Sequence, residues 1–162
     1  MACDSVERER TWLVRSLPET LPAGTPVREG ALVVDGDVVV RVRQTGDERA
    51  ITVAGEDPSG RTEVGWELSP DQFAGLWSLA TCRQVEKVRH AVAVRGAMAH
   101  VDVFGGALEG LVLVAVASGS TAEDDAFVAP EWFGAEVSGD PRYATTALAR
   151  HGVPVDPAAG RA

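Results

Sequence analysis

Alternation of apolar and polar residues with a period of two, rich in valine, dominates this chain and is typical of strands with one buried face. Eight segments carry the pattern, and they span residues 6–14, 31–34, 38–43, 50–54, 61–68, 84–95, 99–104 and 111–118. Turn residues such as Asp35-Gly36 and Gly105-Gly106 separate them. Eight antiparallel strands can close a small barrel and so remove both sheet edges. The pattern therefore predicts an α+β protein built on an eight-stranded antiparallel β-barrel with flanking helices.

Two helices are expected beside this barrel. Ser69 and Pro70 provide an N-cap and a first helical residue, and the apolar stripe that begins at Phe73 has helical spacing. A second helix is expected from Asp140 to Gly152. The 162 residues have the length of one domain, which we place at residues 1–152, and residues 153–162 are expected to form a flexible tail.

Composition argues against some classes of partner. The chain has 15 Lys and Arg residues against 24 Asp and Glu residues, a formal net charge of −9, which is unfavourable for binding nucleic acid or an anionic membrane. The two cysteines have no metal-type spacing, the N-terminus lacks the apolar segment of a signal peptide, and the longest apolar run is too short to cross a bilayer. We therefore expect a cytoplasmic protein, a monomer or homodimer, without nucleic-acid or membrane partners.

Charged side chains recur at alternate positions along the strands, so that pairs of them share a strand face. The pairs are Glu7 and Glu9, Arg41 and Arg43, Arg61 and Glu63, Lys87 and Arg89, and His100 and Asp102. A face of this kind is ordinarily exposed to solvent. The alternative is a closed barrel whose lumen holds the charges, where the few cations would converge on one anion.

Short motifs follow one another along these strands. They are Glu-Arg-Glu-Arg at 7–10, Arg-Val-Arg at 41–43, Arg-Thr-Glu at 61–63, Lys-Val-Arg at 87–89, Val-Asp-Val-Phe at 101–104, and the stretch from Pro130 to Tyr143. In order and spacing the motifs resemble those of the CYTH family of the triphosphate tunnel superfamily. The resemblance implies an eight-stranded antiparallel tunnel in which basic residues bind phosphate oxygens and glutamates bind one or two Mg²⁺ or Mn²⁺ ions. Members of the family hydrolyse triphosphates or form cyclic AMP.

Several positions depart from that family pattern. Lysines of the family are replaced by Thr11 and Ala54, a tyrosine by Ala31, and glutamates by Gly65, His100, Ala115 and Ala117. Because hard divalent cations prefer carboxylate oxygens, these replacements predict weak or absent binding of Mg²⁺ or Mn²⁺. We therefore expect no cofactor and assign no metal ligand.

These departures favour a repurposed, metal-independent acid–base enzyme of the cyclase, lyase or isomerase type, which acts on a small anionic organic molecule of specialised metabolism. Its candidate catalytic residues are Glu7, Glu9, Glu63, His100 and Asp102. Its candidate ligand-binding residues are Arg41, Arg43, Arg61, Lys87 and Arg89.

Two alternatives remain open. One is a hydrolase of triphosphate or organophosphates with a weakly bound Mg²⁺ or Mn²⁺ ion, held by Glu7, Glu9, Glu63 and Asp102. The other is a non-catalytic module that binds an anionic ligand.

Overall fold

The computed structural model describes residues 8–57, 60–80, 84–118 and 126–155, and at a few residues beside the gaps, Arg61 among them, it describes the backbone alone. The described residues form nine strands: β1 (Arg8–Val14), β2 (Thr25–Asp35), β3 (Val38–Thr45), β4 (Glu48–Asp57), β5 (Gly60–Glu67), β6 (Gln84–Val94), β7 (Ala97–Phe104), β8 (Val112–Ser118) and β9 (Phe133–Glu136). Two α-helices, α1 (Pro70–Leu79) and α3 (Thr145–His151), and two 3₁₀ turns, η1 (Gly106–Leu108) and η2 (Pro141–Tyr143), accompany them.

All nine strands belong to one curved sheet in the order β5-β4-β3-β2-β6-β7-β8-β1-β9, and neighbouring strands are antiparallel. The antiparallel sheet was correctly predicted, but the closed eight-stranded barrel is wrong. Within the described residues β5 and β9 are unpaired edges, so the sheet stays open. The physical reason is the short strand β9, because its residues Phe133 and Glu136 pair with β1 on the side that closure would have needed.

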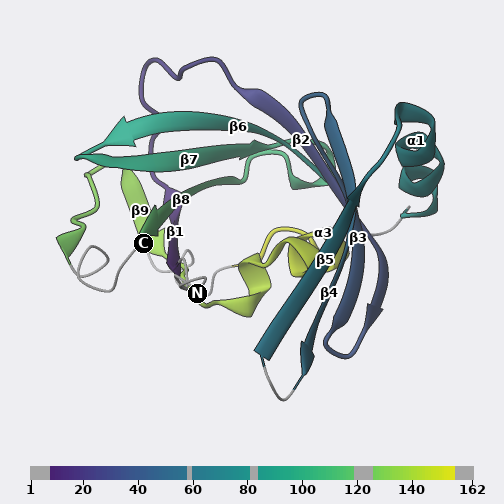
Figure 1. Ribbon diagram of the computed structural model, residues 1–162. Helices are drawn as coiled ribbons and strands as arrows, with labels where there is room; N and C mark the ends of the chain where they lie inside the picture. The colour runs from purple at the N-terminus through teal and green to yellow at the C-terminus, as the bar shows by residue number, and fades with distance from the viewer. Residues whose placement is uncertain (1–7, 58–59, 81–83, 119–125, 156–162) are drawn as a thin grey trace, which may run out of the picture.

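The C-terminal segment lies on the concave side of the sheet (Figure 1). Leu148 of α3 and Tyr143 of η2 are buried there against Val85, Phe104 and Leu113 of the sheet. This apolar cluster holds η2 and α3 in place. The second helix is shorter than predicted, because η2 and α3 are separated by the extended residue Ala144.

Helix α1 lies on the convex side (Figure 1) and was predicted at the correct place. Ser69 and Gln72 form a reciprocal capping box at its start, as the Ser-Pro signal indicated. Gly30 of β2 allows the helix to approach, because a Cβ atom at that position would lie 2.9 Å from the Cβ of Ala80. Glu29 precedes Gly30 in β2, and successive residues of a strand face opposite sides of the sheet. The side chain of Glu29 therefore lies on the concave side.

A second apolar cluster covers the other part of the sheet. Trp12 of β1 packs against Phe127 and Phe133, with ring centroids 5.6 and 5.1 Å apart, and Val101 and Val114 are fully buried beside it. Apolar side chains on both faces thus stabilise the β7-β8-β1 region, while the polar part of the concave face stays free for a site.

Two sequence expectations concern the chain as a whole. In the described residues no helix combines the length and the apolar character that a bilayer crossing requires. Most of the expected flexible tail, residues 156–162, lies outside the described residues.

We predict that Leu148→Ala lowers the free energy of unfolding by about 2–5 kcal/mol, because it leaves a cavity between α3 and the concave face. Denaturant titration measures the change. The matched control is Leu79→Ala at the end of α1, where the side chain is mostly exposed and the same truncation is expected to have little effect. Equal losses in both variants would contradict the packing described for α3.

Candidate functional site

A cavity of about 270 Å³ lies on the concave face, between the sheet and the C-terminal segment. We call it the central cavity. Its charged lining residues come from five strands and are Glu9, Glu29, Arg41, Arg43, Lys87, Arg89 and Asp102. Thr11, Phe104, Leu113, Ala115, Tyr143, Thr145 and Leu148 complete the wall. The alternation of the strands brings these side chains together, because residues at every second position face the same side.

Asp102 of β7 is the most highly coordinated carboxylate of this cavity. Lys87 Nζ donates to its Oδ2 at 2.6 Å, and Arg89 donates through Nε to Oδ1 at 2.7 Å and through Nη2 to Oδ2 at 2.8 Å. The side chains of Lys87 and Asp102 are each only 8% exposed. In addition, Lys87 Nζ lies 5.3 Å from the centre of the Phe104 ring. Both cations are therefore held at the floor of the cavity in one orientation.

These contacts shift the titration of the groups that make them. Burial of the Asp102 carboxyl raises its pKa, but the hydrogen bonds from Arg89 and the charge of Lys87 outweigh burial, so the pKa lies below its usual value. The hydrogen bond to Asp102 raises the pKa of Arg89, against the opposing effect of burial. Asp102 is therefore an ionised acceptor at neutral pH, which argues against the acid–base role expected for it.

The two arginines of β3 differ in how far they are engaged. Arg41 Nη2 lies 2.9 Å from Oε2 of Glu63, and its Nε donates to Thr52 Oγ1 at 3.2 Å. Arg43 makes no hydrogen bond in the described part of the chain, and its Nε is buried without a hydrogen-bond partner. Among the described residues its ion-pair partner is Glu29, whose Oε2 lies 3.9 Å from Nε, so the guanidinium keeps hydrogen-bond donors available to an anion.

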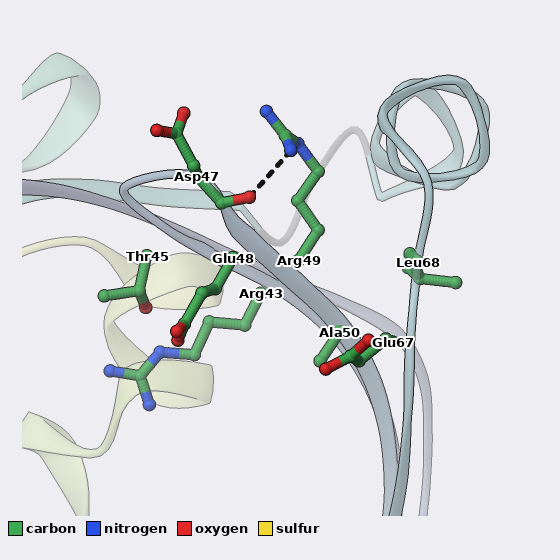
Figure 2. Close-up of a pocket in the computed structure, with 8 residues that line it drawn as sticks. All are labelled: Arg43, Thr45, Asp47, Glu48, Arg49, Ala50, Glu67 and Leu68. Atoms are coloured by element: carbon green, nitrogen blue, oxygen red, sulfur yellow. Dashed lines mark hydrogen bonds between the residues drawn. The ribbon is translucent and has the colours of Figure 1, made fainter.

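Arg43 also borders a second cavity, at the hairpin that joins β3 and β4, which we call the hairpin cavity (Figure 2). There Arg49 turns away from Arg43 and donates to the carbonyl oxygen of Asp47 at 2.8 Å (Figure 2). The two arginines belong to adjacent strands, but Arg43 extends toward the C-terminal segment and Arg49 toward the outside.

Two carboxylates of the central cavity have no hydrogen-bond donor in the described residues. Glu9 of β1 is exposed to the cavity, whereas Glu29 of β2 is buried. Glu29 was not among the predicted site residues, because the predicted strand began at residue 31. Pro26 and Gly30 are unfavourable in strands, so the first half of β2 was not predicted as a strand. The available signal was an acidic residue between Val27 and Ala31, two apolar residues of the same face.

The structure brings most of the predicted site residues together, and four need comment. Glu63 is paired with Arg41 rather than exposed in the cavity lining. His100 lies on the cavity side of β7, opposite Ala115, but does not line the cavity. Glu7 and the side chain of Arg61 lie outside the described residues. The functional roles assigned to all these residues stay predictions.

A divalent cation finds a restricted set of ligands here. No three Asp, Glu, His or Cys side chains gather into a metal cage within the described ranges. A cage is not needed by Mg²⁺, which is usually bound by one or two carboxylates together with substrate phosphates and water. Glu9 and Glu29, whose oxygens have no donor and face the cavity, fit that requirement, while the oxygens of Asp102 are already engaged.

Known proteins resemble this chain in sequence and in fold. An inorganic triphosphatase of Nitrosomonas europaea is 37% identical over 145 residues, which cover 88% of this chain and 96% of that protein. An inorganic triphosphatase of Acetivibrio thermocellus is 32% identical over 135 residues, which cover 82% and 85%. A crystal structure of an inorganic triphosphatase is 36% identical, with a TM-score of 0.76 and coverage of 89% and 94%. No family model matches the chain.

An antiparallel sheet curved around a cation-lined cavity defines the class of triphosphate tunnel folds. With relatives this similar over nearly the whole chain, the protein belongs to the CYTH family of that superfamily. The family resemblance of the short motifs is thereby confirmed.

The same relatives overturn two expectations drawn from single positions and leave a third without support. The metal-independent cyclase, lyase or isomerase is wrong, because the relatives are inorganic triphosphatases. The absence of a cofactor is wrong too, because the inorganic triphosphatases of this family as a rule depend on a divalent metal. A role in specialised metabolism finds no support among them. Alanine in place of glutamate at Ala115 and Ala117 is therefore a weaker guide to function than similarity over the whole chain.

We predict that Asp102→Asn lowers the free energy of unfolding by about 3–5 kcal/mol, because it leaves the nearly buried Lys87 ammonium without a counter-charge. Chemical denaturation measures the loss. Asp140→Asn is the control, because that carboxylate also pairs with an arginine, Arg142, but at the exposed surface, and its loss is expected to be much smaller. Similar effects of the two changes would refute the central role of Asp102.

A second prediction concerns pH. The folded-state pKa of Asp102 lies below its value of about 4 in an unfolded chain, so its contribution is complete above that pH and is lost as the pH falls through the folded pKa. The difference in unfolding free energy between the wild type and Asp102→Asn is therefore expected to shrink as the pH is lowered below about 4. A difference that stays constant in that range would contradict it.

Proposed function

We propose that this protein is a triphosphatase that binds inorganic triphosphate in the central cavity and hydrolyses a terminal phosphoanhydride bond in the presence of a divalent metal. In this reaction water adds to the terminal phosphorus and the bond to the bridging oxygen breaks, which releases orthophosphate and pyrophosphate. The triphosphatase relatives, which cover nearly the whole chain, support the activity.

The observation that carries the proposal is the convergence of four cations on one small cavity, where Arg43 lies in an ion pair with Glu29 at 3.9 Å but makes no hydrogen bond to any described residue. Phosphoryl transfer needs charge neutralisation and positioning more than covalent chemistry from the protein. An arginine whose donors are unoccupied can donate hydrogen bonds to two phosphate oxygens at once. Arg43 is therefore assigned to bind and orient the phosphate chain.

The remaining cations have a supporting place in this scheme. Arg89 and Lys87 are held by Asp102, so they present positive charge without having to reorganise when an anion enters. Arg41 is anchored to Glu63 and Thr52 and borders the same space. Preorganised charge of this kind stabilises the additional negative charge that develops on the transferred group.

Size argues for a compact substrate. Cavities that enclose organic ligands typically have about 300–1,000 Å³, and the central cavity, with about 270 Å³, is close to the lower end of that range. Inorganic triphosphate, which has no organic group to accommodate, suits it better than a nucleotide.

A divalent metal bound with the substrate supplies Lewis-acid polarisation of the phosphoryl oxygens. Glu9 and Glu29 are the residues assigned to hold it. The expected cytoplasmic location and the expected monomer or homodimer stay predictions.

We predict that the protein releases orthophosphate from tripolyphosphate with Mg²⁺ or Mn²⁺, and that Arg43→Ala lowers kcat/KM about 100-fold, as the loss of a preorganised charged donor does. A phosphate-release assay measures both.

Arg49→Ala on the adjacent strand is the matched control, because it removes the same side chain from a position that points away from the central cavity. It is expected to leave kcat/KM unchanged. No phosphate release by the wild type, or equal losses in the two variants, would contradict the proposed function.

A further inference from the structure

Strand β5 is an edge of the sheet and has apolar side chains on its outer face (Figure 1). Glu63 contacts Arg41 on the concave side, so the next residue, Val64, and with it Trp66 lie on the convex side. They are 47% and 58% exposed, and Val38, which lies on the same face of β3, is 46% exposed. Apolar side chains exposed along a strand edge are typical of an interface with another chain.

The backbone hydrogen bonds of the sheet determine which groups of β5 point outward. Leu68 donates its N–H to the carbonyl oxygen of Arg49 at 2.9 Å, and in an antiparallel ladder alternate residues of a strand bond to the same neighbour. The even-numbered residues of β5 therefore bond to β4, and the odd-numbered residues, Gly65 and Glu67 among them, direct N–H and C=O away from it. No strand of the described ranges pairs with that side, so one more antiparallel strand can add to it.

The charges of β5 select one register in which the strand can pair with a second copy of itself. A two-fold axis at Val64 puts Glu63 opposite the partner's Gly65, and Glu67 opposite the partner's Arg61, a residue of opposite charge. An axis one residue earlier or later would put two glutamates opposite each other. Opposite charges across a strand pair stabilise it and like charges destabilise it, so the charges favour the axis at Val64.

The same register also provides a place for the indole ring of Trp66. Trp66 is then opposite the partner's Thr62, and Thr62 pairs with Gly55 of β4 within its own chain. A hollow of about 370 Å³ lies at Gly55 on the convex face, and Val38 and Val53 are among the side chains that line it. The indole can extend across the partner's Thr62 into that hollow, and two-fold symmetry makes the contact twice. Tryptophans buried in this way often dominate the binding energy of an interface.

We propose that β5 is the interface of a homodimer, in which the β5 strands of two copies pair antiparallel about a two-fold axis at Val64 and join the two sheets into one. The partner is a second copy of this chain because the edge is complementary to itself in charge, in backbone hydrogen-bonding groups and in shape. The apolar contacts lie on the convex side, opposite the central cavity, so the inference does not rest on the proposed function.

Sedimentation velocity over a range of protein concentrations measures the association. The wild type is expected to form a species with twice the mass of the 17.0 kDa chain. Val64→Lys places two ammonium groups opposite each other at the axis, so its dissociation constant is expected to rise about 100-fold or more. The matched control is Met98→Lys, which introduces the same charge at an apolar residue of β7 that is 53% exposed and five strands away from β5 in the sheet. It is expected to keep the wild-type dissociation constant.

An exchange of charges tests the register and does not depend on the folding of Val64→Lys. Glu67→Arg places like charges opposite each other at both ends of the strand pair and is expected to weaken the dimer about tenfold. Adding Arg61→Glu to that change restores opposite charges and is expected to restore the wild-type dissociation constant. A wild type that stays monomeric throughout, a Val64→Lys variant that associates as the wild type does, or a double variant no better than Glu67→Arg would each overturn the proposal.

Discussion

The three hydrogen bonds that Asp102 accepts determine how the concave face is organised. They join two adjacent strands, β6 and β7, through side chains as well as through the backbone, and they fix Lys87 and Arg89 in a single arrangement. Two cations at neighbouring alternate positions would otherwise repel each other and extend into solvent. Because the carboxylate is nearly buried, the network is both a structural element and the positive floor of the cavity.

Much of the site could be predicted from the sequence because strand alternation is a local rule. It predicted that Arg41 shares a strand face with Arg43, and Lys87 with Arg89, and the family resemblance joined these faces and Asp102 into one site. The closure of the sheet could not be predicted in that way, since it depends on which strand pairs with β1 at the far end of the chain. Glu29 was missed because the predicted strand began at residue 31, and because the neighbours on β3 and β6 that help to bury it are distant in the sequence.

The error about function has a physical explanation in how a hard cation is bound. Alanine in place of glutamate at Ala115 and Ala117 predicts the loss of a metal cage. However, Mg²⁺ keeps much of its hydration and takes part of its coordination from phosphate. A protein therefore needs few carboxylates to take part, and their strand of origin need not be the one that a family pattern indicates. The fold, carried by the spacing of the apolar positions, was a better guide than the individual polar substitutions.

The pairing of β1 has a consequence for how the molecule is made. Arg8 is opposite Ser118 and Trp12 is opposite Glu136, so the first strand finds its partners only near the end of the chain. Contacts so distant in sequence form slowly, because the intervening segment must be ordered before they stabilise anything. During synthesis β2 to β5 can pair as successive hairpins. Strand β1, which carries Glu9, cannot pair with β8 until that strand has been made. A growing chain thus carries its arginines long before it has an enclosed place to receive an anion, and the site is completed among the last steps of folding.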